Sequence, residues 1–236
     1  GGRGGGRNWG GVVLSWGGRG GGGGESKNQF PEWVATTLPS SLTWQNMTYG
    51  NGKFVAVVYG SDRAAYSTDG ITWTETTFPS TANWRSVTYG NGRFVAVAIG
   101  SNKAAYSTDG ITWTETTLPA TANWQSVTYG NGRFVAVAIG SNKAAYSTDG
   151  IIWTAMILPY TASTSWESVT YGNGKFVAVV HRKNQAAYST DGITWTAMTL
   201  PTAEPWRNAA YGNGKFVLIA ANSNKAAYST DGITWT

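Results

Sequence analysis

The chain has 236 residues, of which 41% are hydrophobic and only 12% charged, and its formal net charge is +5. The 32 Gly, 13 Trp and 12 Tyr residues exclude a coiled coil and argue against a helical enzyme, so we expect an all-β protein. Because the chain has no Cys and a single His, it can form no disulfide and no thiolate metal site, and we expect neither a metal nor a cofactor.

The first predicted segment is a glycine-rich arm, residues 1–30, since residues 1–24 hold 14 of the 32 Gly. A flexible linker is the default interpretation, with an RGG-like nucleic-acid tail and packed polyglycine helices as alternatives. Nucleic acid is not the expected partner. Trp9 and the apolar run Val12–Trp16 are unusual in a linker and predict that this end docks on a partner protein. No apolar run approaches the roughly 18 residues of a membrane span, so we expect no membrane span.

Residues 31–236 are predicted to form one repeat domain. A pattern of the form W-x-S-V-T-Y-G-N-G-[KR]-F-V-A-V recurs at spacings of 40, 40, 42 and 40 residues, and A-A-Y-S-T-D-G-I-x-W-T follows each copy. The five copies start at Trp44, Trp84, Trp124, Trp166 and Trp206. A period of about 40 residues with two turn signals in each unit is typical of β-propellers.

Each unit is predicted to contain four antiparallel strands. In the second unit these are residues 84–89, 94–99, 104–107 and 111–116, with hairpin turns at Asn91-Gly92 and Thr108-Asp109-Gly110 and a break at Pro119. The apolar run 94–98 lacks polar alternation, which indicates a sheet covered on both faces. The fold class is therefore an all-β, five-bladed propeller of four-stranded antiparallel blades.

Residues 32–38 align with the fourth strand of a unit but have no first three strands before them. The last unit stops part-way through its fourth strand, so residues 32–38 are predicted to pair beside residues 233–236 and close the ring. The alternative is an open segment of a longer array.

The segment Ser67-Thr68-Asp69-Gly70-Ile71-Thr72-Trp73 and its four copies resemble the Asp box of sialidase-type, BNR-like β-propellers. The resemblance implies a turn between third and fourth strands, in which the aspartates are structural. These are Asp69, Asp109, Asp149, Asp191 and Asp231. The complete repeat is also similar to repeat tracts in bacterial surface proteins and phage tail proteins.

Sialidases with Asp boxes use an arginine triad. In the present chain, Arg85 and Arg207 stand at equivalent positions of the repeat. The other equivalents are Gln45, Gln125 and Glu167, so a third arginine is missing there. No pair of acidic residues recurs with a spacing that predicts two facing carboxylates. We therefore expect no enzyme and assign no catalytic residue.

The copies vary where the second strand leads to the third and directly after the repeat Trp. Loops on a rigid scaffold are where binding usually resides, although drift on an unconstrained surface gives the same pattern. The candidate ligand-binding residues are Gln45, Arg85, Gln125, Glu167 and Arg207, with the loop residues Tyr59, Asp62, Asn102, Asn142, His181, Asn184 and Asn224.

Two further sets of residues recur. Trp44, Trp84, Trp124, Trp166 and Trp206 are candidates for stacking on sugar rings, but packing between blades is the favoured alternative. Lys53, Arg93, Arg133, Lys175 and Lys215 follow the Asn-Gly turns and are expected to form a solvated ring on the opposite face.

The resulting hypothesis is a binding module that recognises a glycan or cell-surface polymer through several weak sites, as a lectin or a phage tail adhesin does. Such a role predicts an extracellular, cell-surface or virion location. A structural protein of a fibre or virion is the alternative, and a glycoside hydrolase is the third hypothesis.

Overall fold

The structure is a computed structural model, and it describes residues 34–161 and 163–236. Contacts divide the chain into a compact unit, Thr36–Thr236, and a separate unit, Gly1–Ala35. The predicted arm, residues 1–30, and residues 32–33 of the predicted closing strand lie outside the described residues. The predicted domain boundary near residue 30 stays a prediction.

The described residues form an all-β structure, and they contain no helix that could cross a membrane. The strands are β1 (Trp44–Gly50), β2 (Lys53–Ser67), β3 (Thr74–Gly90), β4 (Arg93–Ile99), β5 (Ser101–Ser107), β6 (Thr114–Gly130), β7 (Arg133–Ile139), β8 (Lys143–Ser147), β9 (Thr154–Ile157), β10 (Trp166–Gly172), β11 (Lys175–Val180), β12 (Lys183–Ser189), β13 (Thr196–Glu204), β14 (Trp206–Gly212), β15 (Lys215–Ala220) and β16 (Ala226–Ser229).

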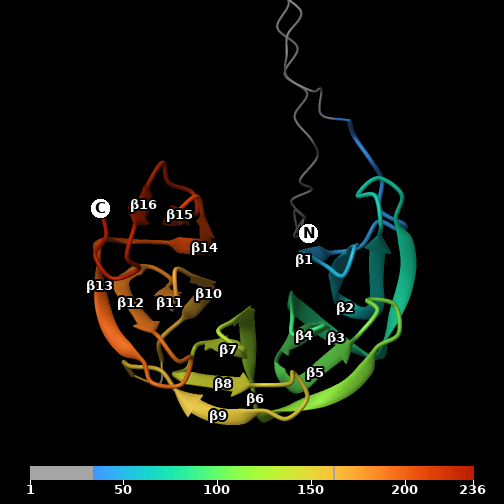
Figure 1. The fold of residues 1–236 in the computed structure, drawn as a ribbon, viewed down its shortest axis with the longest axis horizontal. Helices are drawn as coiled ribbons and strands as arrows, with labels where there is room; N and C mark the ends of the chain where they lie inside the picture. Colours follow the sequence, from blue (N-terminus) through green and yellow to red (C-terminus); the bar gives the residue numbers. More distant parts are fainter. Residues whose placement is uncertain (1–33, 162) are drawn as a thin grey trace, which may run out of the picture. The chain divides into compact units, whose positions relative to one another are not determined.

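All strand pairs are antiparallel, and each Asn-Gly turn closes a hairpin as the sequence predicts. In the second repeat Gly90 pairs with Arg93 around Asn91 and Gly92, both of which have positive φ. Asn and Gly tolerate this left-handed backbone, which matches the twist of the two strands. The repeats follow one another in chain order (Figure 1).

The predicted break at Pro119 is wrong, because β6 runs without interruption from Thr114 to Gly130. Its first part pairs with β5 of its own repeat, and its second part pairs with β7 of the next. Pro119 is exposed and lies between Thr117 and Ala122, where the pairing with β5 shifts its register, so no ladder bond requires its missing N–H. The predicted fourth strand also starts later, because residues 111–113 belong to the turn.

Continuous strands of this kind join the first three repeats into one nine-stranded sheet, β1 to β9. The other two sheets have four strands, β10–β13, and three strands, β14–β16. The number of blades and their four-stranded composition therefore stay predictions.

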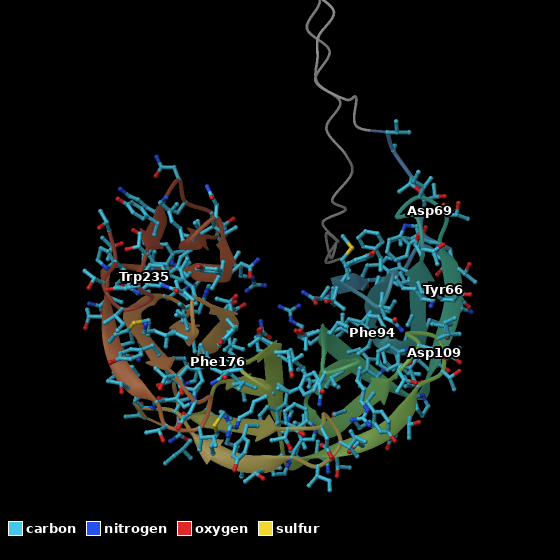
Figure 2. All side chains as sticks on the ribbon, in the orientation of Figure 1. Tyr66, Asp69, Phe94, Asp109, Phe176 and Trp235 are labelled. Atoms are coloured by element: carbon cyan, nitrogen blue, oxygen red, sulfur yellow. The ribbon has the colours of Figure 1, made fainter. Side chains whose placement is uncertain are left out.

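The core lies between consecutive repeats. The run Phe94–Ala98 has no exposed surface, because successive side chains of β4 point to opposite faces and a neighbouring repeat covers each face. Val95 and Val97 pack with Trp124 and Phe134 of the third repeat. Figure 2 shows Phe94 and Phe176 among the side chains that fill these spaces.

The described part of the predicted closing strand, residues 34–38, forms no strand. Instead, the hydroxyl of Thr36 donates a hydrogen bond to the carbonyl of Ile71 in the first repeat. Thr76 makes the same bond to Ile111 of the repeat that follows it, at 2.6 Å. Thr36 therefore occupies the position that a preceding repeat would fill. Thr236 pairs with Tyr228, as a fourth strand would.

The glycine that precedes each Asn-Gly turn allows a tyrosine of the next repeat to lie directly on the backbone. A Cβ atom at Gly90 would lie 2.0 Å from Cγ of Tyr129, whereas one at Gly212 would meet nothing within 4 Å. We expect Gly90→Ala to lower the free energy of unfolding by about 1–3 kcal/mol, because an overpacked core must shift. Gly212→Ala is the matched control and, in dilute monomeric protein, should change it by less than about 0.5 kcal/mol. Urea unfolding followed by tryptophan fluorescence measures both, and equal effects would contradict this packing.

Candidate functional site

The first strand of every repeat carries a β-bulge directly after its Trp. In the second repeat the pairing register shifts between Trp84 and Ser86, which leaves Arg85 as the extra residue. The other bulged residues are Gln45, Gln125, Glu167 and Arg207. A bulge re-aims its side chain, and bulges are frequent beside functional sites.

The five bulged side chains form a continuous row, which we call the polar row. Arg85 donates hydrogen bonds from Nη1 to Oε1 of Gln45 and from Nε to Oε1 of Gln125, the latter at 3.2 Å. Gln125 donates in turn to Oε1 of Glu167 at 2.7 Å. Nη1 of Arg207 lies 2.7 Å from the same Glu167 oxygen and completes an ion pair. The structure thus brings together five candidate residues from five repeats.

The polar row is buried at Gln125 and Glu167, partly buried at Arg85 and open at Arg207. The side chain of Glu167 is 1% exposed, whereas that of Arg207 is 50% exposed. Burial lowers the pKa of Arg85 below its ordinary value, and the nearby positive charge of Arg207 lowers it further, while Glu167 opposes the shift. Two guanidinium groups therefore lie close enough to repel each other, with one carboxylate between them.

A second set of polar residues, next to the polar row, connects neighbouring repeats. Oγ of Ser86 accepts a hydrogen bond from the backbone N–H of Val127 at 3.1 Å, and Ser126 and Ser168 accept equivalent bonds. Asn46 does the same for Val87. Sequence reasoning missed this role, although the recurrence of a small polar residue two positions after each Trp was the available signal.

The candidate loop residues lie at the same end of the strands as the polar row, because Asn83 and Trp84 pair with the last residues of β4. Tyr59 is exposed and near enough to Arg85 to influence its pKa. Nδ1 of His181 lies 3.3 Å from the carbonyl oxygen of Trp206, beside Arg207. The remaining loop candidates have no hydrogen bond to the polar row within the described part of the chain. These are Asp62, Asn102, Asn142, Asn184 and Asn224.

The repeat tryptophans are packing residues. Trp84, Trp124 and Trp166 are 0% exposed and Trp206 is 1% exposed, so their rings cannot stack on a ligand. Trp44, in the first repeat, is partly buried. Stacking on sugars by these four buried rings is therefore excluded in this structure, and packing between repeats is the role that remains.

The expected solvated ring of basic residues is partly wrong. Nη1 of Arg93 donates to the carbonyl of Asp149 in the next repeat at 2.8 Å, and Arg133 makes the same bond to Asp191. Both arginines are partly buried. Each arginine therefore connects its own repeat to the next one by a hydrogen bond, because a turn carbonyl of the next repeat faces the end of the strand that carries the arginine.

The five predicted structural aspartates all organise turns. In the first repeat Oδ1 of Asp69 accepts hydrogen bonds from the backbone N–H of Ile71 at 2.8 Å and of Thr72 at 2.7 Å, and from the Ser67 hydroxyl at 2.9 Å. The same arrangement recurs at Asp109, Asp149, Asp191 and Asp231. Figure 2 shows Asp69 and Asp109 at two of these turns. Elsewhere in the described residues, no three acidic or His side chains gather to hold a metal ion.

No protein-family model and no curated protein match the sequence. Solved structures do match the fold. The chain is similar to a streptogramin B lyase, with 16% identity, coverage of 82% of this chain and 67% of that chain, and a TM-score of 0.72. It is also similar to virginiamycin B lyase from Staphylococcus aureus, with 18% identity, coverage of 84% of this chain and 70% of that chain, and a TM-score of 0.75. A third similar structure is YCF48 bound to D1 peptide, with 18% identity, coverage of 88% of this chain and 70% of that chain, and a TM-score of 0.66.

These likenesses show a β-propeller repeat fold. They also correct the expectation that the chain is not an enzyme: that prediction is wrong, because enzymes, the two lyases, are among the structures that share this fold. The sequence argument tested only the residues of a glycoside hydrolase, and a propeller can carry other chemistry. Membership of the Asp-box family stays a prediction.

The aspartate turns predict a loss of stability in acid. Hydrogen bonds from Ile233 and Thr234 lower the pKa of Asp231 to about 2, against 3.8 as the ordinary value. Partial burial would raise the pKa of Asp109, but hydrogen bonds from Ile111 and Thr112 outweigh it and lower that pKa to about 2. A pKa that is lower in the folded state contributes stability above pH 3.8, and this contribution is lost as the pH falls toward 2.

We therefore expect the melting temperature to fall between about pH 4 and pH 2. The variant Asp109→Asn should be less stable near neutral pH and should show a smaller fall in acid, because one of the five carboxylates no longer titrates. Calorimetry from pH 2 to pH 6 on both proteins measures this. Parallel curves would show that Asp109 does not contribute.

The contact of Arg93 predicts a difference between two basic residues at equivalent positions. Arg93→Ala removes a hydrogen bond to Asp149 and should lower the free energy of unfolding by about 1–2 kcal/mol. Lys53→Ala, in the first repeat, should change it by less than about 0.5 kcal/mol. Urea unfolding of the two variants tests this, and a similar loss in both would contradict it.

Proposed function

We propose that this protein is a binding module that recognises a carboxylate-bearing glycan or cell-surface polymer through the polar row. The observation that carries the proposal is the row of contacts that links two guanidinium groups, Arg85 and Arg207, through Gln125 and a single carboxylate, Glu167. The positive charge of Arg207 lowers the pKa of Arg85, as expected for two cations that repel each other. The row therefore has a net positive charge. An anionic ligand would relieve this repulsion.

The geometry of arginine supports this class of ligand. A guanidinium is planar and presents paired N–H donors that grip a carboxylate or neighbouring hydroxyls in a bidentate way. Arg207 uses Nη1 for Glu167 and keeps half of its side chain exposed, so further donors face solvent. The buried side chains of Gln125 and Glu167 hold the arginines in place.

An aromatic side chain is also available beside the polar row. Tyr59 is 42% exposed and near enough to Arg85 to influence its pKa, so a sugar bound at the polar row could pack on its ring. This residue takes the stacking role that the sequence analysis considered for the repeat tryptophans. The extracellular, cell-surface or virion location and the likeness to a lectin or phage tail adhesin are part of this proposal.

A second candidate is an assembly role, in which the same residues bind an acidic segment of a partner protein. The specific observation in its favour is the similarity to YCF48, whose structure is of a complex with the D1 peptide. A carboxylate on a peptide and a carboxylate on a glycan make the same contacts with arginine. The experiment must therefore offer both kinds of ligand.

We expect the protein, displayed in multivalent form, to bind carboxylate-bearing glycans on an array and to bind their neutral counterparts less. Arg207→Ala should weaken binding about tenfold or more, because hydrogen bonds to a charged group contribute roughly 1.5–3 kcal/mol. Lys175→Ala is the matched control, since it removes one positive charge at the opposite end of the strands and should bind as the wild type does.

Two results would count against the glycan proposal. Equal loss in Arg207→Ala and Lys175→Ala would show an unspecific effect of net charge rather than a site at the polar row. Binding to acidic peptides without binding to any glycan would favour the assembly role instead.

A further inference from the structure

Neighbouring repeats are joined by the same contacts four times along the chain. In the first of these junctions Val57 is fully buried in a cluster with Trp84 and Val87 of the second repeat. The corresponding residues form the other three apolar clusters. The junctions are therefore one interface that is repeated within the molecule.

Polar bonds accompany each apolar cluster. The side chain of Asn131 donates to the carbonyl of Thr190 in the next repeat at 3.0 Å, and Arg133 donates to Asp191 beside it. The ring of Tyr129 lies on the backbone of Gly90 in the repeat before it. Each junction thus combines apolar packing with directional bonds that fix its register.

The last repeat presents the donor half of this interface to solvent. Its exposed surface, which we call the last-repeat face, contains Val217, Ile219 and Tyr228, which are 41%, 53% and 47% exposed. Ile219 corresponds to Val57, which is 0% exposed. The backbone of Gly212 is also uncovered.

The first repeat presents the acceptor half. Its exposed surface, which we call the first-repeat face, contains Met47 and Tyr49, which are 61% and 59% exposed. Met47 corresponds to Val87, which is 4% exposed inside a junction. Tyr49 corresponds to the tyrosine whose ring covers a glycine in each junction.

The two faces match each other residue by residue. Ile219 would meet Met47 as Val57 meets Val87, and the ring of Tyr49 would cover Gly212 as that of Tyr129 covers Gly90. Within one molecule this junction is not formed, since Tyr49 and Gly212 are both uncovered. Figure 1 shows β14 to β16 away from β1.

We propose that the last-repeat face binds the first-repeat face of a second copy of this chain, in a head-to-tail arrangement. The polar bonds favour a second copy over an unrelated partner. Asn213 would reach the carbonyl of Thr68 in the second copy, as Asn131 reaches that of Thr190 within the chain. An interface between two different faces is heterologous, so one face of each molecule is sufficient for a pair.

Sedimentation velocity of the full chain over a range of concentrations tests this association. We expect concentration-dependent oligomers in the wild type. Ile219→Glu on one face and Met47→Lys on the other should each weaken association by at least about tenfold, because a charge would be buried without a partner. Ile152→Glu is the matched control, since Ile152 is 75% exposed on an internal repeat and its substitution should change nothing.

Mixing the two variants distinguishes this arrangement from others. Each variant alone should be monomeric, whereas an equimolar mixture should form a one-to-one pair, because each supplies the face that the other has lost. A wild type that stays monomeric at every concentration would overturn the proposal. Association of Met47→Lys alone, at wild-type strength, would also overturn it, since that result indicates contact between two last-repeat faces.

Discussion

The structure depends on the packing of each repeat against the next. The central strand β4 carries Phe94–Ala98 with no exposed side chain, so neither face of its sheet can be left in water. A single repeat has no means of covering both faces. Stability in such a protein arises from each repeat and its nearest neighbours, as in other repeat arrays, and every internal junction is required.

The same packing determines where the polar row lies. The repeat tryptophans fill the junctions, and the bulge after each tryptophan redirects the next side chain toward its counterparts in the neighbouring repeats. Gln125 and Arg207 both contact Oε1 of the buried Glu167, whereas its Oε2 has no hydrogen-bond partner among the described residues. Arg207, with fewer neighbours, keeps half of its side chain in solvent. The exposure of each side chain in the polar row thus depends on the position of its repeat in the chain.

The sequence predicted the all-β class, the repeat starts and both kinds of turn, because these depend on local chemistry. Asn91-Gly92 specifies a hairpin, and Asp109 with Gly110 specifies a turn, whatever surrounds them. It also predicted that Arg85 and its counterparts lie at one end of the strands. It did not predict that they bond to one another, because this depends on the bulges and on the distance between repeats. The continuity of β6 through Pro119 was missed for a similar reason: pairing with the strands on either side overrides a local break signal.

The turn end of the strands and the end that carries the polar row tolerate amino-acid substitution differently. At the turn end, Asn131 bonds to a backbone carbonyl of the next repeat, as Asn51, Asn91 and Asn173 do, so this position must keep its donor. At the other end, the members of the polar row bond only to each other's side chains. An amide, a guanidinium or a carboxylate can each occupy a bulge position, provided that its neighbour supplies the complementary group. Such a row can change its net charge while the backbone that carries it stays the same.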